Sequence, residues 1–303
     1  PALPFRVQRV SDRVLVFTEL SPWESNHVVI VGAEGLVLVD PAHTELMGRL
    51  IRQAEAAELG RDRFAFVIDT HGHWGHTWGN AAFPEAVVLG HEQAARTIVA
   101  DRANLERRVE IILGQLGEAE SRLDELEEGS EEAREARIEQ DHLDRIVRGL
   151  GEPGFTVQPP RLTFSDRLGL DLGDLSLEMV FLGRGNSQSD IAVLIPEEKI
   201  LLMGCFVPER GPLPVFGTQT TLDPERWLDV LGALLEDEAA FEQVVLGQHS
   251  VWPRERLVAI RNYMAELWSG VRAQEAKGVD FETALQRLPR PEELDFIREA
   301  GAS

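Results

Sequence analysis

The stretch FAFVIDTHGHWGHTWGN, residues 64–80, begins as an apolar strand and ends in a cluster of three histidines. Imidazole is the commonest metal ligand in proteins, and a loop at the end of a strand can turn several rings towards one point. The glycines between the histidines permit the tight backbone turns that this requires. A single histidine here would more often cap a helix or bond to the backbone. Three together, His71, His73 and His76, favour a metal site.

Strand and turn signals alternate on both sides of this stretch. Runs rich in β-branched residues predict strands at Val14–Phe17, His27–Val31, Leu36–Val39, Phe64–Ile68 and Val87–Leu89, with an amphipathic helix at Glu45–Ala57. Later strands are predicted at Leu162–Phe164, Leu175–Leu182, Ile191–Ile195, Ile200–Met203 and Gln243–Leu246. Later helices are predicted from the capping pair Asp223-Pro224 and over Pro253–Lys277 and Phe281–Leu288. This order predicts an α+β fold with two similar β-rich halves.

Residues 93–150 follow a different pattern, which is typical of paired helices. A heptad seam runs through Leu105, Val109, Ile112, Leu116, Ala119, Leu123 and Leu126. Gly129-Ser130 interrupts it, and a second helical stretch follows from Glu131 to Val147. We interpret 93–150 as a coiled-coil-like helical hairpin inserted into a single domain that spans 1–303. A solvated helical pair, a dimerisation arm that makes a homodimer, and a lid over a site all remain open interpretations.

The charge balance excludes some classes of partner. The 303 residues include 30 basic and 52 acidic side chains, so the formal net charge is −22. This field repels phosphate backbones and argues against nucleic acid as a partner. No apolar run approaches the roughly 20 residues needed to span a bilayer, so we expect a soluble protein without a membrane partner. The compartment stays open between cytoplasm and export, since a leader could precede Pro1.

The chain contains a single cysteine, Cys205. One cysteine excludes an internal disulfide and a zinc ribbon built on cysteine pairs. It can still serve as a metal ligand or a nucleophile, or pack as a small apolar side chain.

Five segments in order resemble the metallo-β-lactamase-fold hydrolase superfamily, whose signature after a strand is H-x-H-x-D-H. The segments are Val37–Pro41, His71–His76, Phe181–Asp190, Leu202–Cys205 and Leu246–His249. The resemblance covers most of the chain outside the hairpin and implies an αββα sandwich. It also implies that Asp40 is a buried structural aspartate.

Three positions depart from the family pattern. Gly75 stands where the signature aspartate should be, Asn186 where a histidine should be, and Cys205 where a bridging aspartate should be. One lactamase subclass also places cysteine at this last position, so that exchange can preserve metal binding.

The resemblance implies two sets of metal ligands. His71 and His73 belong to the first site, with Asn186 as a weak ligand at best. His76, Cys205 and His249 belong to the second, which provides the three protein ligands that a catalytic zinc needs. Thiolate favours zinc over magnesium, calcium or manganese. We therefore expect one firmly bound zinc and a second that is weak or absent.

The function that follows is a zinc-dependent hydrolase of a small carbonyl substrate such as an ester, thioester, lactone or β-lactam. The metal would supply hydroxide near neutral pH, and the Asn186 amide would help to stabilise the oxyanion. Asp69 is a further catalytic candidate, and Asp40 and Asp190 are candidates for orienting the ligands. Their alternative role is that of structural turn aspartates. The loss of the aspartate at Gly75 predicts weak activity.

The substrate-binding candidates are Trp74, Arg210 and Phe216. The last two belong to a proline-stiffened segment that follows Cys205, and Arg210 could meet an anionic group. Two other functions compete with hydrolysis. One is a degenerate family member that binds metal or ligand without efficient catalysis, and the other is an interaction protein in which the hairpin matters most.

Overall fold

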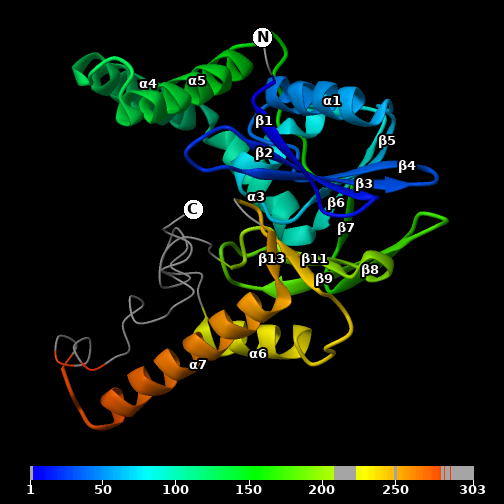
Figure 1. Cartoon of the computed structure of the whole chain (residues 1–303), viewed down its shortest axis with the longest axis vertical. Helices are drawn as coiled ribbons and strands as arrows, with labels where there is room; N and C mark the ends of the chain where they lie inside the picture. The colour runs from blue at the N-terminus through cyan, green and yellow to red at the C-terminus, as the bar shows by residue number, and fades with distance from the viewer. Residues whose placement is uncertain (1–2, 208–222, 249–250, 281–282, 284–286, 288–303) are drawn as a thin grey trace.

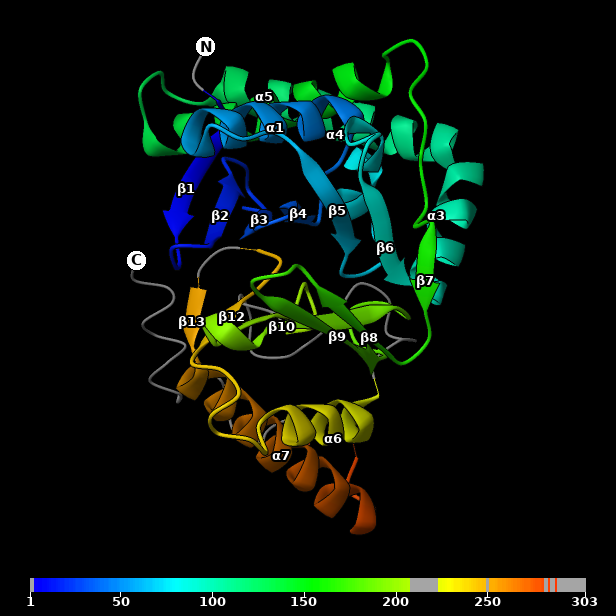
Figure 2. The ribbon, with the colours of Figure 1, turned by 90° about the vertical axis from the view of Figure 1, so that its right-hand side faces the viewer.

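The computed structural model describes residues 3–207, 223–248, 251–280, 283 and 287. Two β-sheets face each other, and helices cover the outer face of each sheet (Figures 1 and 2). This helix–sheet–sheet–helix layering confirms the predicted αββα architecture. The predicted helix at Phe281–Leu288 lies almost entirely outside the described residues.

The first sheet contains strands β1 to β7, arranged in space in their sequence order. Strands β1 to β4 are paired antiparallel, whereas β4 to β7 are paired parallel. Their bounds are β1 Phe5–Arg9, β2 Val14–Glu19, β3 Asn26–Gly32, β4 Gly35–Val39, β5 Phe64–Asp69, β6 Val87–His91 and β7 Leu162–Phe164. The ends of the parallel strands β4 and β5 lead directly into the segments that carry Asp40 and the histidine cluster.

The second sheet has the strand order β13-β12-β11-β10-β9-β8, in which only β11 and β12 are paired parallel. The bounds are β8 Arg167–Asp171, β9 Ser176–Gly183, β10 Asp190–Ile195, β11 Ile200–Leu202, β12 Gln243–Val245 and β13 Val251–Pro253. A short 3-10 turn, η2 Pro196–Glu198, joins β10 to β11.

Three apolar layers hold the sandwich together. The middle layer lies between the sheets and includes Ile30, Ile68, Ile191 and Val245. Helix α1 Glu45–Leu59 packs on the outside of the first sheet, and α6 Pro224–Leu234 and α7 Arg254–Ala276 pack outside the second. As predicted, Asp223 caps α6, because its side chain accepts the backbone N–H of Arg226.

The region between β5 and β7 contains the helices that surround the site. These are α2 Trp74–Thr77, the 3-10 helix η1 Trp78–Ala82, α3 Glu92–Ala103, α4 Leu105–Glu125 and α5 Glu131–Leu150. Helices α4 and α5 form a hairpin that projects from the sandwich (Figure 1), and the Ser130 hydroxyl caps α5. Their seam buries Ile112, Ala119, Leu143 and Ile146. The base of the hairpin lies against the domain, since α5 also packs on α1.

The sequence analysis did not predict three short strands, β1, β8 and β13. Each is an edge strand of its sheet or carries several exposed residues, so none shows the apolar pattern of a buried strand. Within the described part of the chain, no helix combines the length and apolar character that crossing a bilayer requires.

Glu55 is an acidic residue on the buried, apolar face of α1. Its side chain is fully buried, and neither carboxyl oxygen has a hydrogen-bond partner. Burial raises the pKa of Glu55 well above the usual value of 4.5, although the charge of Arg52 partly opposes this. The folded state therefore holds a proton that the unfolded state releases above pH 4.5, so this group costs stability as the pH rises.

We expect Glu55→Gln to stabilise the fold at pH 8 by on the order of 1 kcal/mol, and by less at pH 5, because glutamine needs no proton to be neutral. Chemical denaturation of both proteins at the two pH values measures this difference. Glu58→Gln on the exposed side of α1 is the matched control and should change little at either pH. An equal effect of Glu55→Gln at both pH values would contradict a buried neutral carboxyl group.

Candidate metal centre

The histidine cluster opens into a cavity of about 840 Å³ between the two sheets and the hairpin. Several parts of the chain line it. The loop after β5 contributes His71, His73 and His76, and the loops after β9 and β11 contribute Asn186 and Cys205. Helix α4 supplies a further wall with Arg108, Ile111, Ile112 and Gln115, and His43 and Asp101 also line the cavity. The hairpin therefore forms part of the cavity wall.

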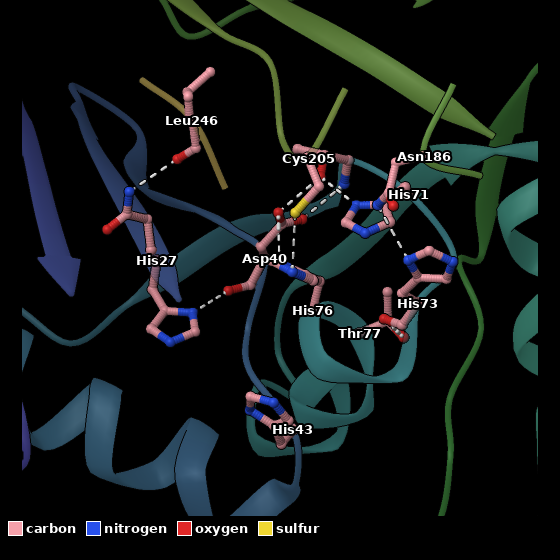
Figure 3. A network of polar contacts seen from close by, with 12 residues as sticks. His27, Asp40, His43, His71, His73, His76, Thr77, Asn186, Cys205 and Leu246 are labelled. Atoms are coloured by element: carbon pink, nitrogen blue, oxygen red, sulfur yellow. Dashed lines mark hydrogen bonds and ion pairs between the residues drawn. The ribbon is translucent and has the colours of Figure 1, made fainter. Parts of the chain in front are cut away.

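Asp40 organises the site from beneath. It follows β4 with a left-handed backbone (φ 60°) and is almost fully buried. Its carboxylate accepts the Thr70 backbone N–H at 2.8 Å, the Thr70 hydroxyl at 2.7 Å and Nδ1–H of His76 at 3.1 Å (Figure 3). These bonds tie the end of β4 to the loop that carries the histidines.

The hydrogen bonds of Thr70 decide the tautomer of His71. Because the Thr70 hydroxyl donates to Asp40, its oxygen accepts from Nδ1–H of His71 at 3.0 Å. Nε2 of His71 then carries a lone pair, and it is buried with no hydrogen-bond partner. Burial, followed by the neighbouring His76 and His73, holds the pKa of His71 well below its usual value, so the ring is neutral. A neutral imidazole with a free, buried Nε2 is the form that binds a metal ion.

His76 and Cys205 face each other across the same space. Nε2 of His76 lies 3.4 Å from Sγ of Cys205, while its Nδ1 is held by Asp40. Burial lowers the pKa of His76, but Cys205 and Asp40 together raise it well above its usual value. A raised pKa favours protonation of His76, whose Nε2–H then faces Sγ. A metal ion bound there would replace that proton.

His73 has a different environment. Its Nδ1 lies 3.1 Å from Nδ2 of Asn186, in front of the cavity (Figure 3). Burial, with the charges of His76 and Arg108, lowers the pKa of His73 to about 4. The ring is therefore neutral at pH 7, and its Nδ1 accepts an N–H of the Asn186 amide.

The residues present fit a zinc ion. Ligand atoms of His71, His76 and Cys205 all lie within 4.8 Å of one another. Imidazole nitrogen and thiolate sulfur are both zinc ligands, and three protein ligands with a fourth position open, here to the cavity, are the arrangement of a catalytic zinc. This grouping cuts across the two predicted sites, because it joins His71 from the first with His76 and Cys205 from the second. His249 lies outside the described residues.

Gly75 occupies the signature position without a side chain, and His43 fills the space beside it. A Cβ at residue 75 would lie 3.0 Å from Nε2 of His43, closer than neighbouring atoms normally approach. The ring of His43 also packs edge-on against Trp74, with a centroid separation of 4.8 Å. Glycine therefore leaves room for an imidazole that comes from the segment after β4.

The two other aspartates stabilise the surrounding backbone. Asp69 is fully buried and accepts an N–H of Asn80, which also donates to the Gln158 carbonyl. It does not line the cavity, and burial raises its pKa well above the usual value. Asp190 accepts the Ser187 backbone N–H at 2.8 Å, and burial raises its pKa to about 7. The structure thus places both carboxyl groups against loops, and neither meets a ligand imidazole.

The structure places only one of the three predicted substrate-binding residues. Trp74 lines the cavity, whereas Arg210 and Phe216 lie outside the described residues. The sequence analysis did not single out Arg108, which lines the cavity with its guanidinium 5.3 Å from the centre of the Trp74 ring. In the sequence it is one of many charges between heptad positions, so only the folded hairpin reveals it.

Comparison with known proteins decides the family. The model of the metallo-β-lactamase superfamily matches residues 20–249, which contain β3 to β12 and the hairpin. The chain belongs to the metallo-β-lactamase superfamily. The predicted resemblance is therefore confirmed, together with the fold that it implied.

Several solved structures share the fold at low sequence identity. A metallo-β-lactamase from Pontibacter korlensis is 16% identical with a TM-score of 0.60, and the match covers 86% of this chain and 99% of that one. The metallo-β-lactamase FIM-1 from Pseudomonas aeruginosa in its mono-zinc form is 14% identical with a TM-score of 0.58, covering 86% and 95%. The sec-alkyl sulfatase PisA1, as a double mutant, has a TM-score of 0.67 at 16% identity, covering 94% of this chain and 45% of that one. No curated protein matches the sequence.

We expect single alanine replacements of His71, His76 or Cys205 to reduce bound zinc much more than His73→Ala. The first three remove a member of the close group, whereas His73 directs its Nδ1 to Asn186. Losing one of three ligands should weaken zinc binding by at least 10- to 100-fold, the loss that removal of supporting contacts alone produces. Competition with a chromophoric chelator measures the affinity. An equal or greater loss for His73→Ala would show that the ligands group differently.

Proposed function

We propose that this chain is a zinc-dependent hydrolase of a small substrate with an electrophilic carbonyl group, such as an ester, thioester, lactone or β-lactam. The observation that carries the proposal is the set of His71, His76 and Cys205 on the wall of an open cavity. Membership of the superfamily supports it, because most members are metal-dependent hydrolases.

Zinc, when bound, supplies a Lewis acid that polarises a carbonyl group and makes water acidic enough to react near neutral pH. The chain's own residues prepare the site for this. Asp40 fixes His76 directly and His71 through Thr70, so that both rings present Nε2 to one point. Fixed ligands with a set tautomer hold a metal more tightly and keep its open position in place.

Asn186 is suited to bind the substrate oxygen that gains negative charge. One N–H of its amide is used by His73, and the amide has a second N–H available on the cavity side. A donor held in place before the reaction stabilises a developing oxyanion without having to reorient. Asn186 thus takes a positioning and stabilising role and is not required as a ligand.

The hairpin supplies the specificity of the proposed reaction. Arg108 brings a positive charge to the cavity wall beside Trp74, Ile111 and Ile112, where its guanidinium also lies 3.8 Å from Oδ1 of Asp101. We infer that the preferred substrates carry an anionic group at a distance from the scissile bond. A guanidinium can bind a carboxylate through two parallel hydrogen bonds.

A binding protein without efficient turnover is the second candidate. Gly75 favours it, because no carboxylate at that position can orient the attacking water. The two candidates agree on metal binding and differ only in catalysis.

We expect the purified, untagged protein to hydrolyse at least one chromogenic ester, lactone, thioester or β-lactam in a way that a chelator abolishes and zinc restores. Cys205→Ala should lose this activity by 100-fold or more. Zinc bound without any chelator-sensitive turnover would favour the binding protein instead. Activity that survives both chelation and Cys205→Ala would contradict a role for this centre.

We expect Arg108→Ala to raise KM about tenfold for a substrate with a carboxylate and to leave a neutral analogue nearly unchanged, since a charged hydrogen bond contributes about 1.5–3 kcal/mol. Arg107→Ala removes the same charge from an exposed neighbouring position and serves as the control. Steady-state kinetics with paired anionic and neutral substrates measure the difference. Equal losses with both substrates would mean that Arg108 only supports the wall.

A further inference from the structure

A second cluster of titratable side chains lies beside the cavity. It consists of Glu19 at the end of β2, His27 in β3, His43 before α1 and His142 in α5. All four are buried, and Glu19, His27 and His142 have at most 1% of their surface exposed. Figure 3 shows His43 on the far side of His76 from Cys205 and Asn186. His43 also lines the cavity, but the ligand atoms of Glu19, His43 and His142 form a group distinct from that of His71, His76 and Cys205.

Each oxygen of the Glu19 carboxylate lies close to an imidazole nitrogen of the cluster. Nδ1 of His43 lies 3.5 Å from Oε1 of Glu19, and Nδ1 of His142 lies 3.4 Å from Oε2. In a tetrahedral zinc site with bonds of about 2.0–2.1 Å, neighbouring ligand atoms are about 3.4 Å apart. One ligand atom from each of the three residues can be chosen so that all lie within 4.8 Å of one another.

These atoms also have no other partner among the described residues. Oε2 of Glu19, Nδ1 of His43 and both ring nitrogens of His142 are buried without a hydrogen bond. Each such atom costs about 1–3 kcal/mol of desolvation when nothing replaces its water. This many buried atoms without a partner require an explanation, and a bound cation would satisfy one atom from each of the three residues.

The fourth member, His27, supports the carboxylate. Its Nδ1 donates to the Asp40 carbonyl oxygen at 2.5 Å, and its Nε2 lies 3.2 Å from Oε1 of Glu19. This contact fixes the orientation of the carboxylate and leaves Oε2 free. Ligating carboxylates in metal sites are commonly held by an outer partner in this way.

The protonation states agree with this geometry. Burial lowers the pKa of His142 to about 3, so its ring is neutral and available as a ligand. Burial alone would raise the pKa of Glu19, but the surrounding imidazoles of His43, His142 and His27 lower it well below its usual value. Glu19 is therefore ionised and His142 is neutral, which are the forms in which these two residues bind a metal ion.

We propose that Glu19, His43 and His142 form a second, separate site for a divalent transition metal, with zinc best suited to the donor set. Two imidazoles and one carboxylate are ligands that zinc accepts in a tetrahedral arrangement. The three residues come from β2, the segment before α1, and α5, so the ion would fasten the hairpin to the first sheet. It would thereby hold the wall that carries Arg108 against the cavity.

Cobalt(II) distinguishes the two sites by spectrum. The full-length Cys205→Ala/His71→Ala variant lacks two ligands of the first centre, so any remaining cobalt reports on the proposed site. We expect this variant to retain close to one cobalt per chain, with visible ligand-field bands and no thiolate-to-cobalt charge-transfer band. Adding His142→Asn should remove the bands. Adding Glu19→Gln, which keeps the shape of the side chain, should also remove them.

The control is His91→Asn in the same background. His91 is another buried histidine, stacked on Phe181 at 3.8 Å and remote from this cluster in the sequence and the sheet order, and its replacement should leave the cobalt spectrum unchanged. Circular dichroism establishes that each variant is folded. As a second readout, metal should slow hydrogen exchange in residues 131–150 of the background variant but not after His142→Asn.

A folded background variant that binds no cobalt, or one whose spectrum survives both His142→Asn and Glu19→Gln, would overturn the proposal. The cluster would then be a metal-free network of hydrogen bonds and ion pairs. Because the test uses a variant without the first centre and without any activity measurement, its result is independent of the proposed hydrolase function.

Discussion

The buried side chain and backbone of Asp40 are the element on which the rest of the site depends. Its carboxylate holds Thr70 and His76, and through Thr70 it sets the tautomer of His71. Its carbonyl oxygen accepts from His27, which in turn holds Glu19. A single residue at the end of β4 thus holds two groups of potential metal ligands in place, one through its side chain and the other through its backbone.

The backbone of this segment is strained to make that possible. Both Asp40 (φ 60°) and Ala42 (φ 76°) have left-handed conformations, which are unfavourable for residues with a side chain and cost about 1–3 kcal/mol each. Aspartate tolerates this conformation better than alanine does. Surrounding bonds hold the segment, since the Asp40 N–H donates to Ile68 and the Gly79 N–H donates to Ala42. The result is that Asp40 and His43, three residues apart, point into different clusters.

Much of this site follows from sequence because its parts are local. A buried strand that leads into three histidines, a strand that ends in an aspartate and the capped helix at Asp223 are patterns of neighbouring residues, and all appear in the structure. The grouping of the ligands could not be predicted in the same way. It depends on which ring nitrogen Thr70, Asp40 and Asn186 engage, and those contacts join segments 30 to 113 residues apart.

The second cluster could not be predicted from the sequence for a related reason. Glu19, His43 and His142 have no characteristic spacing, and two of them look like ordinary residues at the end of a strand and on a solvated helix face. Their burial is set by how α5 returns from the hairpin to pack on α1. The same holds for Arg108, whose position over Trp74 depends on the docking of α4.

Gly75 and His43 bring the two clusters together at the position where this chain departs from the family signature. Nε2 of His43 lies 3.0 Å from the place that a Cβ at residue 75 would occupy. An aspartate at residue 75 would therefore require the imidazole of His43 to shift. The other edge of the same ring faces Glu19, with Nδ1 3.5 Å from Oε1. A side chain at residue 75 would thus act on both clusters, on the first through the cavity that Gly75 lines and on the second through the position of His43.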